Sequence, residues 1–341
     1  MGKKILVTGS AGFIGGYVVE ELLNNGWDVV GIDNYSKYGK VEKSYDRHPR
    51  YTFVEGDVKN TGLMTELASG CEQLIAGAAM IGGITYFHEL AYDLLAENER
   101  ITASTFDAAI AAYKKGSLKK ITVMSSSMVF ESATKFPTPE GTELTSPPPL
   151  TTYGFQKLSC EYFARGAKMQ YELPYTIVRP FNCVGIGERR ALTDHEVMSG
   201  NVSLAMSHVV PDLVQKILKG QDPLHILGSG SQVRHYTYGG DLARGIRLCV
   251  ETEAALNEDF NLSTDVSTTV LELAEVIWKK IHPNKPFNYT SDKPYDHDVQ
   301  RRVPDTTKAK KVLGFEATTT LDNILDEVIP WIGEQIKLGT I

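Results

Sequence analysis

A tyrosine and a lysine four residues apart, Tyr153 and Lys157, are the side chains in this sequence best suited to proton transfer. On a helix, positions i and i+4 lie on one face, one turn apart. A lysine ammonium beside a phenol stabilises the phenolate, so such a tyrosine can exchange a proton with a substrate hydroxyl near neutral pH. A second pair with this spacing, Tyr289 and Lys293, lies in a polar segment before Pro294 that reads as a loop, and we treat it as a chance match.

Three consecutive serines, Ser125–Ser127, precede this pair and lie where a core strand should end. The segment before them, Lys120–Met124, is typical of a buried parallel strand. Ligands of open α/β sheets bind outside the carboxyl ends of the strands, so a serine here can share a hydrogen bond with the reacting hydroxyl. Without the tyrosine and the lysine, the serines would read as a strand end that caps a turn.

A glycine-rich turn stands near the start of the chain. Gly9, Gly12 and Gly15 follow a predicted strand, Lys4–Thr8, and open a predicted helix, Phe13–Asn24. The first glycine makes the tight turn, the second lets the backbone approach a pyrophosphate, and the third lets the helix pack closely on the strand. The helix N-terminus then offers N–H groups to the phosphates. This context predicts a dinucleotide site.

An acidic residue, Asp33, ends the second predicted strand, Asp28–Asp33. A carboxylate there can accept hydrogen bonds from the adenosine ribose hydroxyls and would repel a 2′-phosphate, which favours NAD over NADP. The alternative is a glycine turn that binds no dinucleotide, with a solvated Asp33. Strand, glycines, helix, strand and terminal acid together argue against it.

The elements that must position these residues alternate along the first half of the chain. Such alternation predicts an α/β fold, a doubly wound parallel sheet of the Rossmann type with helices on both faces. After about Gly185 the pattern loosens, and residues 185–206 show no clear period, which is typical of a smaller, irregular substrate-covering part. Further strands are expected at 51–54, Gln73–Ala76, 175–179 and Leu224–Leu227, and helices at Ala91–Lys114, 153–170, 209–219, Val270–Ile281 and 321–336.

Composition excludes several classes of protein. The 341 residues suggest about two domains. The net charge of −7 argues against a broadly cationic nucleic-acid binder, and no apolar run approaches the ~18 residues of a membrane span. The four cysteines are far apart, without a C-x-x-C pair, which favours a reducing, cytoplasmic location and no metal site. We expect no nucleic acid and no membrane among the partners.

Segments spread over essentially the whole chain carry a specific resemblance. They are TGSAGFIG (8–15), GIDN (31–34), GDV (56–58), IAGAA (75–79), Asn98, SSSMVF (125–130), YGFQK (153–157), RPFNCVGIGE (179–188), HVVPDLVQK (208–216), GSGSQVRHYTYGGDLARGI (228–246) and QRRVPDTTKAKKVLGF (300–315). With these segments the chain resembles the extended short-chain dehydrogenase/reductase superfamily, in its nucleotide-sugar epimerase/dehydratase branch. The resemblance implies a tightly held NAD and a nucleotide-sugar substrate.

The resemblance also assigns roles to individual residues. Ser126, three residues before Val129, is preferred over Ser127 as the catalytic hydroxyl; Tyr153 is the base, and Lys157 also holds the nicotinamide ribose. The implied cofactor-binding residues are Gly9, Gly12, Phe13, Ile14, Asp33, Asn34, Asp57, Val58, Ala78, Tyr153, Lys157 and Pro180. The implied substrate-binding residues are Ser126, Asn182, Val209, Arg234 and Arg302, although Asn182 could instead cap a turn, Arg234 could be a solvated strand residue, and Arg301 and Arg302 could be a solvent-facing pair.

The resemblance also implies a division of the chain into two domains and an oligomeric state. Residues 1–180 would form the NAD-binding domain, with returning segments near 230–265, and residues 181–341 would mainly bind the nucleotide sugar. Relatives commonly form homodimers through the helices near 91–114 and 153–170. The apolar side chains that would serve there, or would instead face the sheet, are Phe106, Ala109, Ile110, Tyr162 and Phe163.

The residues after the catalytic serine bear on the reaction. In relatives, 4,6-dehydratases carry an acidic pair where this chain has Ser127 and Met128, decarboxylases carry Glu at Met128, and 3,5-epimerising enzymes carry Cys there. C4 epimerisation through a 4-keto intermediate remains, because it needs only Ser126, Tyr153, Lys157 and NAD. The intact trio also argues against a non-catalytic sensor of dinucleotides.

Other features keep alternatives open: a dehydratase, decarboxylase or reductase of the same family, or a GDP-sugar epimerase. Residues 79–84 resemble a substrate loop of GDP-sugar enzymes, and His208 stands where one of them has an acid/base histidine, although we favour a binding or packing role. The tail 298–305 looks most like that of UDP-glucuronate decarboxylases, and a buried Arg302 would favour an acidic sugar. A UDP-hexose or UDP-hexuronate is therefore the expected substrate.

Overall fold

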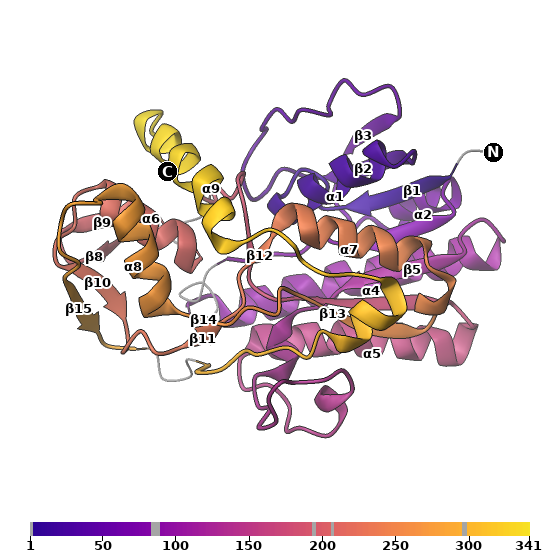
Figure 1. Ribbon diagram of the computed structural model, residues 1–341. Helices are drawn as coiled ribbons and strands as arrows, with labels where there is room; N and C mark the ends of the chain where they lie inside the picture. Colours follow the sequence, from indigo (N-terminus) through magenta and orange to yellow (C-terminus); the bar gives the residue numbers. More distant parts are fainter. Residues whose placement is uncertain (1–2, 83–88, 193–195, 206–207, 295–298) are drawn as a thin grey trace.

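A sheet of seven parallel strands forms the centre of the molecule in the computed structural model, which describes residues 3–82, 89–192, 196–205, 208–294 and 299–341 (Figure 1). The strands lie in the order β13-β6-β5-β4-β1-β2-β3. Their bounds are β1 Lys4–Thr8, β2 Asp28–Asp33, β3 Tyr51–Glu55, β4 Gln73–Ala76, β5 Lys120–Met124, β6 Tyr175–Pro180 and β13 Glu258–Leu262.

The strand order reverses direction at β1, which pairs with β2 on one side and with β4 on the other. Such a switch point opens a crevice at the carboxyl ends of the strands, where ligands of doubly wound sheets bind. The glycine turn follows β1 there, and Ser125–Ser127 follow β5 at the same edge, because all seven strands are parallel.

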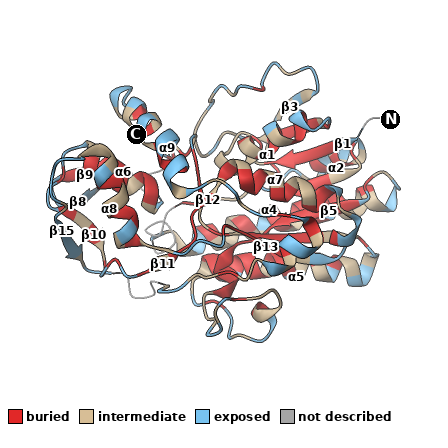
Figure 2. Ribbon diagram, viewed as in Figure 1, coloured by how far each residue is buried: buried red, intermediate tan, exposed pale blue. Residues whose placement is uncertain are grey.

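Helices cover both faces of the sheet, as the sequence predicts. On one face α1 Phe13–Asn24 packs with α7 Gly239–Glu251. On the other face lie α2 Thr61–Ser69, α4 Ala91–Lys114 and α5 Thr152–Tyr171. Figure 2 shows the sheet and the inward helix faces buried, and the outer faces mostly intermediate or exposed. The doubly wound fold is confirmed.

A smaller, irregular part of the chain gathers at one end of the molecule (Figure 1). Its own apolar core joins α6 Val209–Leu218, α8 Val270–Ile281 and α9 Leu321–Lys337. Strand β10 Leu224–Leu227 pairs with β15 Tyr289–Asp292, and β8 Glu196–Ser199 forms a hairpin with β9 Val202–Ala205. Two short pairs complete the strands of the described residues: β7 Cys183–Val184 with β12 Thr237–Tyr238, and β11 Val233–Arg234 with β14 Thr268–Thr269.

The structure corrects or completes the sequence-based predictions at three points. The segment at Tyr289 is a strand rather than a loop; three of its four residues are exposed, so it carries no apolar alternation to reveal it. Residues 185–206 contain the β8–β9 hairpin. Phe106 and Ala109 are buried against the sheet, whereas Tyr162 is exposed. Within the described ranges, no helix combines the length and the apolar character that crossing a membrane requires.

Candidate active site

One large cavity lies across the carboxyl ends of the strands and extends toward α6 and β10. Its volume of about 1060 Å³ exceeds the roughly 300–1,000 Å³ of a pocket for one drug-sized ligand, so it has room for a dinucleotide and a second molecule. All of the residues that the sequence analysis assigned to the site line this cavity: Gly9, Gly12, Phe13, Ile14, Asp33, Asn34, Asp57, Val58, Ala78, Ser126, Tyr153, Lys157, Pro180, Asn182, Val209, Arg234 and Arg302.

The glycine turn is built so closely that side chains would not fit. Gly9 has a φ of +72°, and a Cβ atom on it would lie 2.9 Å from the Cα atom of Ala78. A Cβ atom on Gly15 would lie 2.0 Å from the carbonyl oxygen of Gly9. Gly12 stands at the N-cap of α1, and the first residues of that helix, Phe13 and Ile14, line the cavity. This bare backbone at a helix N-terminus fits the pyrophosphate of a dinucleotide.

The Asp33 carboxylate, at the end of β2, ties the turn to the sheet. Its oxygens accept hydrogen bonds from the backbone N–H of Ala11, at 3.1 Å, and of Tyr35, at 2.8 Å. Burial raises the pKa of Asp33, and these two N–H donors oppose the rise. Each carboxylate oxygen has a second lone pair, so Asp33 can still accept from the ribose hydroxyls of NAD.

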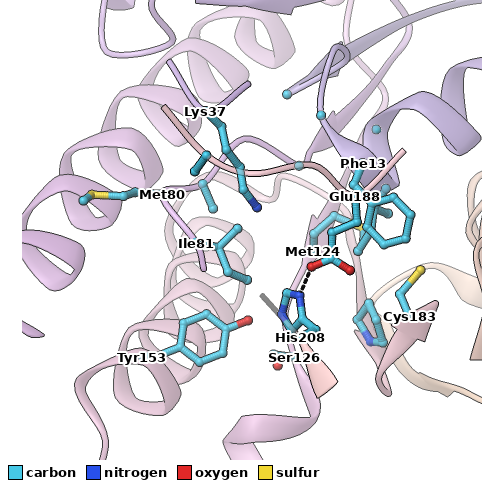
Figure 3. A pocket seen from close by; sticks show the side chains of 18 of the residues that line it. Phe13, Lys37, Met80, Ile81, Met124, Ser126, Tyr153, Cys183, Glu188 and His208 are labelled. Carbon is cyan, nitrogen blue, oxygen red and sulfur yellow. Dashed lines mark hydrogen bonds and ion pairs between the residues drawn. The ribbon is translucent and has the colours of Figure 1, made fainter. Parts of the chain in front are cut away.

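Tyr153 and Lys157 project from the first turns of α5, which begins where the Thr151 side chain accepts a hydrogen bond from the N–H of Gly154, at 3.1 Å. Lys157 Nζ donates to the carbonyl oxygen of Met124, at 3.0 Å, and lies 6.0 Å from the centre of the Tyr153 ring. The strand end therefore fixes the ammonium beside the phenol. Figure 3 shows the Tyr153 hydroxyl directed into the cavity.

The three serines differ in their surroundings. Ser125 Oγ donates to Glu161, at 2.6 Å, within a buried ion-pair network. Ser126 Oγ accepts from the N–H of Met128, at 3.2 Å, and stands on the same side of the cavity as Tyr153 (Figure 3). Because Ser126 keeps its own hydrogen to donate, it suits a shared hydrogen bond to a substrate oxygen.

An apolar wall adjoins the phenol. Met128 is 4% exposed and packs with Tyr153 and Leu94, with Met80 and Ile81 around them. The loop that carries Met80 is held by Asn98, whose side chain accepts from the N–H of Met80 at 2.7 Å and donates to its carbonyl at 2.8 Å. Gly83 and Ile84, at the end of the loop compared with GDP-sugar enzymes, lie outside the described residues.

The neighbouring residues Arg301 and Arg302 point to different surroundings. Arg301 is exposed and lies over the Phe136 ring, with 4.7 Å between its guanidinium carbon and the ring centre. Arg302 donates its backbone N–H to Val233, at 3.2 Å, which brings it beside Arg234 on the cavity wall. Burial raises the pKa of Tyr236, and both cavity arginines oppose the rise because they lie near its hydroxyl. Two cations at one place suit a diphosphate.

The sequence analysis did not assign a role to Glu188. Its carboxylate contacts His208 Nδ1, and both side chains line the same cavity as Ser126 and Tyr153 (Figure 3). Burial acts to raise the pKa of Glu188, but His208 and Lys37 outweigh it and hold the pKa below its usual value. The imidazole therefore lies on the cavity wall beside a carboxylate whose charged form is favoured.

Comparisons with known proteins identify the family of this chain. The model of the NAD dependent epimerase/dehydratase family matches residues 5–263. UDP-glucose 4-epimerase of Lactobacillus helveticus is 26% identical over 344 residues, 96% of each chain. UDP-N-acetyl-alpha-D-glucosaminuronate decarboxylase of Bacillus cytotoxicus is 27% identical over 340 residues, covering 98% of this chain and 99% of that one.

Among solved structures, UDP-glucose 4-epimerase of Thermotoga maritima with UDP-glucose superposes with a TM-score of 0.79 and 29% identity, covering 98% of this chain and 99% of that one. The fold, the cavity and the sequence matches agree. The chain belongs to the NAD dependent epimerase/dehydratase family and is an NAD-dependent enzyme.

Proposed function

We propose that the protein is an isomerase that epimerises a nucleotide sugar at C4 through a 4-keto intermediate. The observation that carries this proposal is the placement of Ser126, Tyr153 and Lys157 on one cavity, with the apolar Met128 beside the phenol instead of an acid. A bound NAD would supply a reversible hydride acceptor for the C4 hydrogen, which allows the hydrogen to be restored on the other face of the sugar.

The chain's own groups manage the proton. Tyr153, as the phenolate stabilised by the Lys157 ammonium, accepts the proton of the 4-hydroxyl, and Ser126 donates a hydrogen bond to the same oxygen. On the return step Tyr153 gives the proton back, so no cofactor or proton is consumed. The glycine turn and Asp33 hold NAD, while Asn182, Val209, Arg234 and Arg302 hold the nucleotide part of the substrate.

The sugar is the least constrained part of the proposal. The curated and structural relatives named for UDP-glucose make a UDP-hexose the first substrate to test. Arg302, a half-buried cation on the cavity wall, supports a uronic acid as the second substrate to test, because a guanidinium can bind a sugar carboxylate with two hydrogen bonds. Turnover of UDP-glucuronate should then exceed that of UDP-glucose; equal rates would remove the uronic-acid hypothesis.

The experiment that tests the proposal is a panel of UDP-, dTDP-, GDP- and CDP-sugars incubated with the enzyme in D₂O and followed by NMR. A C4 epimerase gives a product of unchanged mass, with no deuterium on carbon and no net absorbance change at ~340 nm. The reason is that the hydride removed from C4 is the same one that returns to C4, so neither solvent deuterium nor net NADH appears. A product of altered mass, or net consumption of NADH, would instead indicate a dehydratase, decarboxylase or reductase.

The Glu188–His208 pair favours a second candidate reaction, which the same NMR experiment can detect. A histidine backed by a buried carboxylate can remove a proton from a carbon next to a keto group. Epimerisation at such a carbon, as in a 3,5-epimerising enzyme, would place solvent deuterium on the sugar ring. Ring deuterium that disappears in His208→Asn would support this second candidate over simple C4 epimerisation.

We further propose the division of labour expected from the sequence: residues 1–180, with segments near 230–265, for NAD, and residues 181–341 mainly for the nucleotide sugar. The return of β13 to the main sheet and of α7 to α1 supports the inclusion of the later segments. A homodimer in a reducing cytoplasm remains our expectation. The four cysteines, all of them unpaired, are consistent with that compartment.

A further inference from the structure

The cavity continues past Arg234 and Arg302 into the space between α6 and β10. Figure 1 places these two elements, together with β15, at the end of the molecule away from β1–β3. Apolar side chains line this space: Val209 and Leu213 from α6, and Ile226 and Leu227 from β10. If the proposed function holds, a nucleotide sugar with its sugar at Tyr153 and its diphosphate at the arginines must place its base here.

A charged pair stands among these apolar walls. Lys216 Nζ lies 2.8 Å from Asp212 Oδ2, one turn earlier on α6, and donates to the carbonyl oxygen of His225 on β10, at 3.1 Å. Lys216 is 5% exposed, and the Asp212 side chain 24%. Both line the cavity. A second acidic residue at this end, Asp292 of β15, accepts from His225 at 2.8 Å.

An ion pair that only stabilises a helix does not have to lie in a cavity. Pairs at i and i+4 usually lie in solvent, as Glu275 and Lys279 do on α8, whereas burying a pair costs desolvation that must be offset by further hydrogen bonds. Lys216 obtains one from β10 and, as an ammonium, has a third N–H to offer. Asp212 has its second oxygen, Oδ1, to offer, and Oδ2 keeps a second lone pair beside its contact with Lys216.

The pKa of Asp212 supports this view. Burial raises it, while the Lys216 ammonium opposes the rise and Asp292 adds to it. The carboxylate thus lacks part of the solvation that an exposed acid has. Additional N–H donors from a ligand would stabilise its charged form.

The available groups match one nucleobase better than the others. A carboxylate only accepts, and it binds most strongly when two neighbouring N–H donors meet it in a bidentate contact. Guanine presents a ring N–H next to an amino group, with a carbonyl oxygen on the other side. Uracil presents one N–H between two carbonyls, and cytosine and adenine each pair an amino group with a ring acceptor, which would face the carboxylate unfavourably.

We infer that Asp212 and Lys216 select the nucleobase, and that the base is guanine. Asp212 accepts from its ring N–H and amino group, and Lys216 donates to its carbonyl oxygen, while α6 and β10 enclose its faces. The substrate of the proposed epimerase is then a GDP-sugar rather than the uridine nucleotide expected from the sequence.

The first test uses the unaltered enzyme. NAD-loaded protein is titrated calorimetrically with GDP, UDP, CDP and ADP; the loaded cofactor keeps ADP out of the dinucleotide site. GDP should bind at least about tenfold more tightly than the other three, because hydrogen bonds to a charged, partly buried acceptor are worth about one to two decades in Kd. Binding of UDP as tight as that of GDP would overturn the inference.

Two matched variants sharpen the test. Asp212→Asn should weaken GDP binding about tenfold or more and leave UDP binding nearly unchanged. Of these bases, only guanine presents two adjacent N–H donors to the two oxygens of the Asp212 carboxylate. Glu275→Gln makes the same chemical change in the exposed pair on α8 and should alter neither. An equal loss for GDP and UDP in Asp212→Asn would show a structural role only. Should that variant fail to fold, the unaltered enzyme's preference still decides.

The binding test separates this inference from the proposed function. Tight GDP binding without turnover of any GDP-sugar would support the base assignment and count against C4 epimerisation. Efficient epimerisation of UDP-sugars, with UDP bound more tightly than GDP, would support the function and overturn the base assignment.

Discussion

At the scale of single residues, the proposed chemistry depends on one phenol whose position is fixed from two directions. Its ring is 5% exposed and packs on Met128, while Lys157 is anchored to the end of β5 and so cannot swing away from it. The arrangement holds a proton acceptor close to a substrate oxygen without any acid from the following residues. The hydroxyl itself, rather than the bulk of the ring, should therefore carry the activity.

Removing only that oxygen gives the residue-scale prediction. Tyr153→Phe should lower kcat by a factor of about 10² to 10⁴, the usual contribution of a positioned acid/base group, while NAD content and thermal stability stay near those of the unaltered enzyme. Steady-state kinetics with the best substrate of the panel measures it. Tyr162→Phe is the control, because Tyr162 lies on the same helix with 58% of its surface exposed. An unchanged kcat in Tyr153→Phe would exclude the phenol as the base.

At the scale of elements, the cofactor site is a junction of β1, α1 and β4 whose spacing leaves no room for side chains. The carbonyl oxygen of Gly9 lies where a Cβ atom of Gly15 would have to be, and Ala78 after β4 approaches Gly9 itself. Thr8 Oγ1 adds hydrogen bonds from the N–H groups of Gly77 and Ala78, both at 3.0 Å. The atoms that let α1 pack closely are therefore the same ones that we propose for phosphate binding.

A single methyl group tests this junction. Gly15→Ala should displace α1 from the turn, so that the purified protein loses most of its bound NAD, measured by absorbance after denaturation. Gly166→Ala on α5 is the matched control: its Cβ would meet nothing within 4 Å, and the higher helix propensity of alanine should stabilise the fold by up to ~1 kcal/mol. Normal NAD content in Gly15→Ala would contradict the close packing described here.

At the scale of the whole molecule, one buried guanidinium connects distant parts of the chain. Arg179 on β6 donates to Glu161 on α5 through Nε and Nη2, both at 2.7 Å, and to Asp259 on β13 at 2.7 Å. Glu143 lies 3.0 Å from the same group. Arg179, Glu143 and Glu161 have fully buried side chains, so each charge depends on the others for its solvation.

Arg179→Met should therefore destabilise the protein by about 3–5 kcal/mol, because it leaves buried carboxylates without a counter-charge. Denaturant unfolding followed by circular dichroism measures the change. Arg47→Met serves as the control: Arg47 is paired with Glu42 at 3.8 Å in solvent, where such pairs contribute about 0–1 kcal/mol. A loss below ~1 kcal/mol for Arg179→Met would mean that water reaches the network.

The same network predicts sensitivity to acid. Burial acts to raise the pKa of Asp259, but Arg179 and Lys308 outweigh it, so the folded-state pKa lies below its ordinary value of 3.8. A depressed pKa contributes stability above the ordinary value, and this contribution is lost as the pH falls through the folded pKa. Below about pH 4, the unfolding free energy of Asp259→Asn should therefore fall less steeply than that of the unaltered protein. Parallel pH curves would refute this.

Much of the site was predictable because its parts are local in the sequence. Strand, glycine turn, helix and terminal acid are consecutive, and Tyr153 and Lys157 are one helical turn apart, so backbone geometry alone brings each set together. Parallel pairing in the doubly wound sheet then places these sets at one edge. For these residues the amino-acid pattern was sufficient.

Other features depended on contacts between segments far apart in the chain. Glu188 meets His208 across 20 residues, His225 meets Asp292 across 67, and only the path of the tail beside β11 turns Arg302 inward while Arg301 stays in solvent. No local period encodes such pairs, because their side chains are polar and their segments are short. Tertiary packing decides them, and the packing of α6, β10 and β15 decides the surroundings of the nucleobase that we infer.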